Sequence, residues 1–388
     1  MKSLSSAIFL AITLGCAAEP TVPVINIISP VQDEQVKGTI TLKIDLETTS
    51  SHLEEFQLWL DGSQVGIPDP GKMGKKHRFE LTMDTTLLTE GKHTLVAMAR
   101  TEGEKAEWAQ QTAEFVVDNQ PLKLNLVIEP TDPKQGQAFF LKVYTNKPLD
   151  ELSVDFMEQK PQFFPTQDGS YIAALGARPS FASGDYPIAV NIIVNGKPTD
   201  LSGSIHLVSG KFPHEAINMP VATSAKVLGR TEAQKAAEQE ELVGAVTKVD
   251  PQLYEKGALV KPVEGKLTSP FYITRTFSDG NAESHNGVDY AAPEGTPIVA
   301  DGAGIVRLAR EHIARGKFVC IDHGRGWFSI LQHMSEIDVE EGQMVEKGQL
   351  VGKVGMTGYA NGDHLHWEMR LNRWCVDPRQ FLTHGFEY

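Results

Sequence analysis

Residues 284–306 read SHNGVDYAAPEGTPIVADGAGIV, and residues 355–370 read GMTGYANGDHLHWEMR. The first segment places His285 four residues before Asp289, and the intervening Gly287 favours a loop or a strand end over a helix. In the second segment His364 and His366 are two residues apart, so in a strand both imidazoles point to the same face. The two segments therefore predict short strands and loops that carry a polar site.

The spacing of these residues is consistent with a catalytic zinc centre. Another histidine, His333, lies between the two segments, within LQHMS at residues 331–335. Catalytic zinc takes three protein ligands and a water molecule. The His and Asp of the first segment and one His of the second would complete that set. Two histidines then remain, and a hydrolase needs one as a general base and one to stabilise an oxyanion.

The sequence around these residues resembles a known enzyme family. From about residue 267 to residue 382 the chain resembles the lysostaphin-type, LytM-like zinc endopeptidases, metallopeptidase family 23. The matching text is SHNGVDYAAPEGTPIVADGAGIV (284–306), VCIDHGRGWFSILQHMS (319–335), VEEGQMVEKGQLVGKVGMTGYANGDHLHWEMR (339–370) and VDPRQFL (376–382). The resemblance implies a mainly antiparallel β-sheet with the site in an open groove. The family commonly has Tyr two residues before the middle histidine, where this chain has Leu331.

The resemblance also implies roles for the five residues. It implies that one zinc ion per chain is held by His285, Asp289 and His366, and that His333 and His364 are the two catalytic histidines. Which of the two catalytic histidines is the base stays open.

Family members cleave peptide stems or cross-bridges of bacterial peptidoglycan, which implies that peptidoglycan is the partner of this chain. A polyglycine bridge and a direct D-amino-acid cross-link both fit the family. A D,D-endopeptidase is favoured, because the upstream organisation resembles that of exported members from Gram-negative bacteria. Two other functions are a catalytically silent scaffold that activates a cell-wall amidase and a surface adhesion protein. The presence of all five site residues disfavours the scaffold.

The rest of the chain is predicted to be mainly β. Alternating apolar residues such as Leu42, Ile44 and Leu46 indicate strands, and the stretch resembles bacterial immunoglobulin-like domains. We expect an immunoglobulin-like β-sandwich over residues 21–119, a second one over 120–209, a helical linker over 210–260 and the endopeptidase domain over 261–388. The linker contains RTEAQKAAEQEELVGAV, which predicts a helix of about four turns. A solvated linker helix is favoured, and the alternative is a segment that docks against the endopeptidase domain and limits access to its groove.

The N-terminus predicts export. Residues 1–18 contain Lys2, an apolar run too short to span a bilayer, and small residues, as in a signal segment. Cleavage after Ala18 would discard the segment, whereas the LGC end at residues 14–16 would leave Cys16 lipidated. The protein would accordingly be periplasmic, anchored to the outer membrane as a lipoprotein, or secreted.

Charge and cysteine content narrow the classes of partner and site. The formal net charge of −14 argues against a sequence-independent nucleic-acid binder, which needs a basic face. Apart from Cys16, the cysteines are Cys320 and Cys375, which an oxidising compartment would allow to pair, or which are two buried thiols. The sequence does not indicate an oligomeric state.

Overall fold

The computed structural model describes residues 22–48, 53–65, 75–101, 107–217, 231–278, 280 and 282–386. The predicted signal segment with Cys16 lies outside these residues. No helix in the described part of the chain is long and apolar enough to cross a membrane. The chain divides into two compact units, residues 1–121 and residues 122–388. The predicted mainly β class is confirmed in both units.

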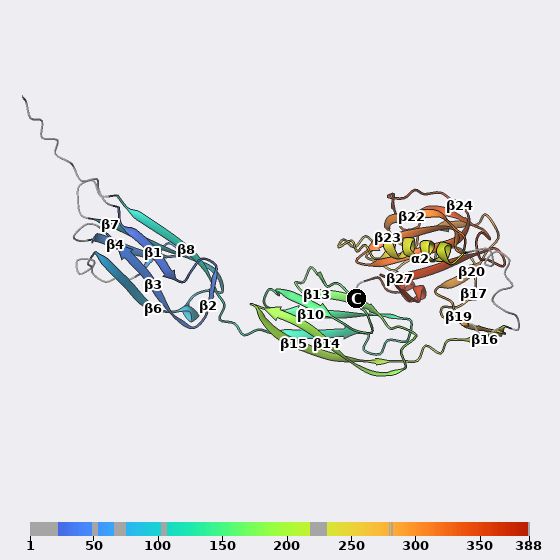
Figure 1. The fold of residues 1–388 in the computed structure, drawn as a ribbon, viewed down its shortest axis with the longest axis horizontal. Helices are drawn as coiled ribbons and strands as arrows, with labels where there is room; N and C mark the ends of the chain where they lie inside the picture. Colours follow the sequence, from blue (N-terminus) through green and yellow to red (C-terminus); the bar gives the residue numbers. More distant parts are fainter. Residues whose placement is uncertain are drawn as a thin grey trace, which may run out of the picture. The chain divides into compact units, whose positions relative to one another are not determined.

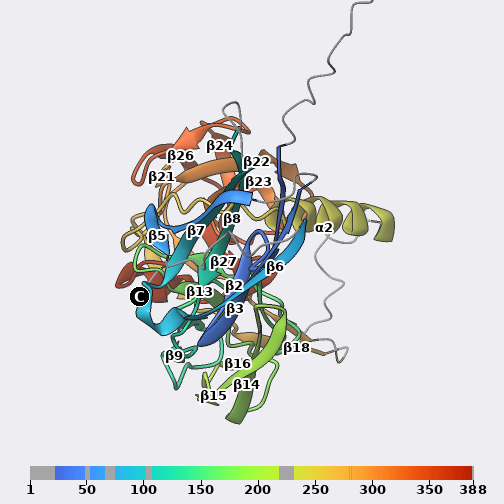
Figure 2. The same ribbon diagram turned by 90° about the vertical axis from the view of Figure 1, so that its left-hand side faces the viewer.

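The first unit is a sandwich of two sheets (Figure 1; Figure 2). One sheet has the strand order β1-β3-β6 and the other the order β2-β8-β7-β4-β5. Strand β3 buries Leu42, Ile44 and Leu46 between the sheets, as their alternation predicted. The strands are β1 (Val24–Ser29), β2 (Glu34–Val36), β3 (Thr39–Glu47), β4 (Leu53–Leu60), β5 (Ser63–Val65), β6 (Lys76–Asp84), β7 (Gly91–Thr101) and β8 (Ala109–Val117).

The second unit begins with another sandwich. Its sheets have the orders β12-β13-β10-β9 and β11-β14-β15, and they enclose a core of their own. The strands are β9 (Leu124–Glu129), β10 (Ala138–Thr145), β11 (Glu151–Val154), β12 (Phe164–Pro165), β13 (Tyr171–Gly176), β14 (Gly184–Val194) and β15 (Lys197–Leu207).

A ten-stranded, largely antiparallel sheet dominates the C-terminal part of the second unit. Its main path is β17-β20-β27-β24-β23-β22-β25, and β21, β26 and β28 pair at its sides. A small sheet has the order β16-β18-β19, and its last strand in sequence, β19, ends directly before His285. The strands are β16 (His214–Ile217), β17 (Lys266–Ser269), β18 (Thr274–Phe277), β19 (Ala282–Ser284), β20 (Val288–Ala291), β21 (Pro297–Val299), β22 (Gly304–His312), β23 (Gly316–Gly324), β24 (Trp327–Ile337), β25 (Met344–Val345), β26 (Leu350–Val354), β27 (His364–Leu371) and β28 (Trp374–Val376).

The second sandwich and the C-terminal part share a hydrophobic core. Side chains of β10 alternate: Phe139 faces the core of the sandwich, and Phe140 joins the core of the large sheet. The Phe140 ring lies 6.2 Å from the Trp327 ring, and the backbone N–H of Ala138 donates to Gln380 Oε1 at 2.8 Å. The sandwich thus supports the C-terminal part directly.

The helix expected in the linker is α2 (Glu232–Val246), and it packs against the large sheet (Figure 1). Thr231 caps its N-terminus in a capping box with Gln234. Leu242 and Val246 are fully buried against apolar side chains of β22, β23 and β24, and Glu241 pairs with His312 at 2.6 Å. The helix is therefore docked through its last turns, which differs from the solvated linker favoured by its Ala- and Glu-rich composition.

The two described cysteines do not form a disulfide. Cys320 lies on β23 and Cys375 on β28, and the strand order β28-β27-β24-β23 places three strand spacings between them. That separation is about 14 Å at ~4.8 Å per strand, twice the roughly 7 Å beyond which Cα atoms cannot be bridged. Burial raises the pKa of the Cys320 thiol to about 12. The pair is therefore two protonated, unreactive thiols.

Candidate metal centre

Strand pairing and one tight turn bring the three predicted metal ligands together. Asp289 on β20 and His366 on β27 are direct partners in the antiparallel register. His285 follows β19, and a turn connects it to Asp289. This turn passes so close to β27 that a Cβ at Gly287 would lie 2.3 Å from the Trp367 carbonyl oxygen. Glycine is therefore required between the two ligands of the first motif.

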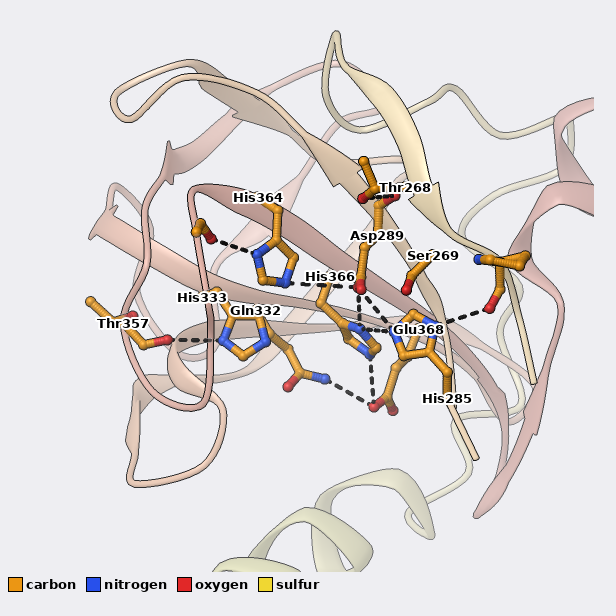
Figure 3. Close-up of polar contacts among 12 residues, drawn as sticks. Thr268, Ser269, His285, Asp289, Gln332, His333, Thr357, His364, His366 and Glu368 are labelled. Atoms are coloured by element: carbon orange, nitrogen blue, oxygen red, sulfur yellow. Dashed lines mark hydrogen bonds and ion pairs between the residues drawn. The ribbon is translucent and has the colours of Figure 1, made fainter. Parts of the chain in front are cut away.

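The three donor atoms form a close triangle (Figure 3). Asp289 Oδ1 lies 2.9 Å from His285 Nε2 and 2.8 Å from His366 Nδ1, and the two nitrogens are 2.9 Å apart. Around a tetrahedral zinc ion, ligand atoms ~2.0–2.1 Å from the metal are about 3.3 Å apart. A small outward shift of the side chains would therefore accommodate zinc.

The second nitrogen of each of these two histidines has its own partner. His285 Nδ1 lies 3.1 Å from the carbonyl oxygen of Pro270, to which it donates, and His366 Nε2 lies 3.3 Å from Glu368 Oε1. These contacts orient both rings so that His285 Nε2 and His366 Nδ1 face Asp289 Oδ1. Metal-binding histidines are oriented in this way in proteins generally. The donor set therefore fits zinc in both ligand chemistry and ring orientation.

The electrostatics of the triangle favour a bound cation. Burial alone would raise the pKa of the Asp289 carboxyl, but hydrogen bonds from His285 and His366 outweigh it and hold the pKa well below its usual range. Burial alone would lower the pKa of His366, but the Asp289 and Glu368 carboxylates raise it to about 9. A fixed anionic oxygen between two imidazoles attracts positive charge, which is supplied by a proton or by a metal ion.

His333 and His364 lie beside the triangle (Figure 3). Their rings are 4.8 Å apart between centroids, and the His333 ring is 6.0 Å from that of His366. His333 Nδ1 lies 2.9 Å from the carbonyl oxygen of Thr357, and His364 Nδ1 lies 2.8 Å from that of Gly362. Donation to these carbonyls leaves Nε2 of both rings facing the centre, and His364 Nε2 is 3.8 Å from Asp289 Oδ1.

The backbone of β24 is irregular at the middle histidine. His333 has a φ of +67°, and its N–H leaves the ladder to donate to the carbonyl oxygen of Arg315 at 3.0 Å. This left-handed conformation, uncommon for a residue with a Cβ, turns the imidazole toward the triangle of donor atoms. Burial, together with the charges of His366 and His364, lowers the pKa of His333 to about 3. The ring is therefore neutral at physiological pH.

The structure places all five predicted site residues at one site, and sequence reasoning missed three of their neighbours. Glu368 and Arg370 continue the His364–His366 face of β27, and Gln332 lies beside His366 on β24. The two-residue period that paired the histidines would have found Glu368 and Arg370. Leu331 is fully buried in the hydrophobic core, so it does not line the metal centre.

Two segments of the chain match known families. Residues 283–378 match the family described as Peptidase family M23, and residues 23–97 match the family described as Bacterial Ig domain. The first segment contains all five site residues, and the second covers most of the strands of the N-terminal sandwich.

Individual proteins show the same likeness over part of their length. The peptidoglycan DD-endopeptidase ShyA of Vibrio cholerae is 44% identical over 85 residues, which cover 22% of this chain and 20% of that protein. The DD-carboxypeptidase/endopeptidase Mpg of Neisseria meningitidis serogroup B is 36% identical over 128 residues, 32% of this chain and 30% of that protein. A crystal structure from Pseudomonas aeruginosa, assigned to peptidase M23, has 30% identity and a TM-score of 0.47, covering 61% of this chain and 88% of that one. The chain thus spans less than a third of the length of these curated relatives.

Proposed function

Because residues 283–378 form an M23 peptidase domain, we propose that the protein is a zinc endopeptidase that hydrolyses peptide cross-links of bacterial peptidoglycan. One observation carries the proposal. A triangle of two imidazole nitrogens and a carboxylate oxygen lies beside two further histidines whose Nε2 atoms face it. The names of the relatives, peptidoglycan DD-endopeptidase and DD-carboxypeptidase/endopeptidase, support peptidoglycan as the substrate and a D,D bond as the target.

In this proposal His285, Asp289 and His366 hold one zinc ion per chain. Their hydrogen bonds to Pro270 and Glu368 keep the ligand nitrogens directed at the metal. When bound, zinc supplies a Lewis acid that lowers the pKa of a water molecule and polarises the scissile carbonyl.

His333 and His364 divide the proton chemistry between them. Because each Nδ1 donates to a backbone carbonyl, each Nε2 accepts a proton in the neutral ring and donates one in the protonated ring. Because His333 is buried and its Nε2 faces the triangle, we assign it the role of general base. His364 is then the residue that, when protonated, stabilises the developing oxyanion.

Digestion of purified peptidoglycan tests this function. Residues 22–388 would be incubated with sacculi, with and without a zinc chelator, and the released muropeptides identified by mass spectrometry. We expect cleavage of D,D cross-links that stops with chelator and returns with added zinc. His333→Ala should abolish cleavage, whereas His206→Ala, at an exposed position of the second sandwich, should leave it intact.

The outcome also discriminates between functions. A folded, zinc-loaded protein that cleaves neither a D,D cross-link nor a polyglycine bridge would contradict the proposal. Activation of a separate wall amidase by such a protein would support the scaffold function, and cell-surface binding that depends on the N-terminal sandwich would support adhesion.

We also propose that the protein is exported, because its substrate lies outside the cytoplasm. Cys16 is the proposed lipidation site of a lipoprotein form. Labelling of cells with radioactive palmitate would test this: a label lost in Cys16→Ser supports the lipid anchor. An unlabelled protein whose N-terminus begins after Ala18 would contradict it.

A further inference from the structure

We infer that Glu368 is a positioning residue of the metal centre, which orients the His366 ring so that Nδ1 faces the metal. The inference rests on the proposed function only in taking His366 as a zinc ligand. Glu368 lies on β27 two residues after His366, so both side chains project from the same face of the sheet (Figure 3). The carboxylate therefore lies behind the ligand ring, on the side away from Asp289.

Every oxygen of this carboxylate has an assigned donor. Oε1 lies 3.3 Å from His366 Nε2 and accepts from Gln332 Nε2 at 2.9 Å. Oε2 accepts from the Arg370 guanidinium, at 2.9 Å from Nε and 2.8 Å from Nη2. Because Gln332 and Arg370 donate to these oxygens, Glu368 is not itself a metal ligand. It contacts the metal centre through His366.

The arrangement explains why His366 is a ligand through Nδ1 and His285 through Nε2. The contact of His366 Nε2 with Glu368 holds the ring so that Nδ1 lies 2.8 Å from Asp289 Oδ1, on the side of the metal. When a metal replaces the proton on Nδ1, Nε2 keeps its proton and donates it to Glu368. A carboxylate partner also makes the imidazole a stronger donor to a metal. Without Glu368, Nε2 loses this partner, and the ring is held less firmly in the metal-binding orientation.

The burial of the cluster formed by Glu368, Arg370 and Gln332 indicates a role beyond packing. Glu368 is 4% exposed and Arg370 is 5% exposed. Replacing a buried ion pair by apolar residues of similar volume is often neutral or stabilising, so such a pair is weak evidence for a purely structural role. The cluster also includes Gln332, which precedes the base His333 and is the register partner of His366. It therefore fixes the orientation of the ligand strand and the base strand together.

The test compares Glu368→Gln with wild type in the full chain, using zinc alone and no substrate. Competition with a chelator of known affinity gives the zinc dissociation constant, and NMR of ¹⁵N-labelled histidine gives the rate at which the His366 Nε2 proton exchanges with solvent in the zinc-loaded protein. We expect the variant to bind zinc about 10–100-fold more weakly and its Nε2 proton to exchange faster than in wild type. Glu336→Gln is the matched control, because this glutamate lies on the neighbouring strand β24, is exposed and pairs with Lys353, and it should match wild type.

A second variant keeps the test informative if Glu368→Gln fails to fold because Arg370 is left unpaired. The double variant Glu368→Gln/Arg370→Met removes both charges of the buried pair. We expect it to fold, as judged by circular dichroism, and to bind zinc as weakly as the single variant. A folded variant with the wild-type zinc affinity and the wild-type exchange rate of the His366 Nε2 proton would overturn the inference. Because no substrate is used, that result would leave the proposed endopeptidase activity untouched, and absence of peptidoglycan cleavage would leave the zinc comparison valid.

Discussion

Replacing Phe140 with alanine tests whether the second sandwich holds the C-terminal part of its unit in shape. Phe140 is 3% exposed and contacts Trp327 across the boundary between the two parts, although it lies on a strand of the sandwich. Loss of the ring would leave a cavity against the core of the large sheet. We expect the C-terminal part to be destabilised by a change made more than one hundred residues away in sequence.

The magnitude follows from the size and burial of the ring. Phe→Ala in a core costs about 3–5 kcal/mol, a large part of the ~5–15 kcal/mol of stability of a typical domain. For a unit of this length each kcal/mol lowers the midpoint of thermal unfolding by roughly 2–4 °C. The expected decrease is therefore about 6–20 °C.

Tryptophan fluorescence of residues 122–388 provides a reporter of one part alone. Residues 122–209 contain no tryptophan, whereas the C-terminal part contains Trp327, Trp367 and Trp374. Thermal unfolding of Phe140→Ala should therefore show the tryptophan transition shifted to lower temperature. Circular dichroism of the same samples would follow the strands of both parts.

Phe139→Ala is the matched control, because the neighbouring ring is equally buried but faces the core of the sandwich itself. We expect it to destabilise the sandwich and to shift the tryptophan transition less than Phe140→Ala does. An unchanged tryptophan transition in Phe140→Ala, with a destabilised sandwich, would refute the shared core. Equal shifts in both variants would mean that the whole unit unfolds cooperatively and that the Phe140 contact has no special role.

Three further predictions concern the metal site, the docked helix and the first unit. His366→Ala should lose tight zinc binding and turnover together, whereas His333→Ala should keep zinc and lose turnover; metal analysis and peptidoglycan digestion would check both, and stoichiometric zinc with normal activity in His366→Ala would refute the ligand assignment. Leu242→Ala should destabilise residues 122–388 by about 2–5 kcal/mol in urea unfolding, because this side chain of α2 is fully buried against the large sheet. Gln239→Ala, at an exposed position of α2, is its control, and equal stability of Leu242→Ala and wild type would contradict docking. In the first unit, burial lowers the pKa of His93, but hydrogen bonds to Asp61 and to a backbone carbonyl outweigh burial and raise the pKa above its usual value. The stabilisation of the first unit by His93 is therefore complete below about pH 6.5, the pKa of histidine in the unfolded chain. It is lost as the pH rises through the raised pKa of the folded state. The midpoint of thermal unfolding of residues 22–121 should fall over that pH range, and His93→Asn should remove this part of the pH dependence.

The chemistry of the site could be predicted from local sequence because it is encoded at short range. His364 and His366 share a face through the two-residue period of a strand, and Asp289 follows His285 across a glycine-containing turn. The pairing of these two distant segments needed the family resemblance, since no local pattern states which strands are neighbours. The same period extends to Glu368 and Arg370. Sequence does not show that these two charged residues are buried beside Gln332, because that depends on the pairing of β27 with β24.

Sequence by itself determined the β class and the alternation along strands such as β3, and it predicted the five residues of the candidate site. Periodicity shows which faces of a strand are apolar, because burial acts on each side chain locally. It does not show what each face packs against, since that depends on contacts between residues far apart in the chain. Only the tertiary structure therefore decided that Phe139 and Phe140 enter different cores, that α2 docks on the large sheet, and that Cys320 and Cys375 are too far apart to pair.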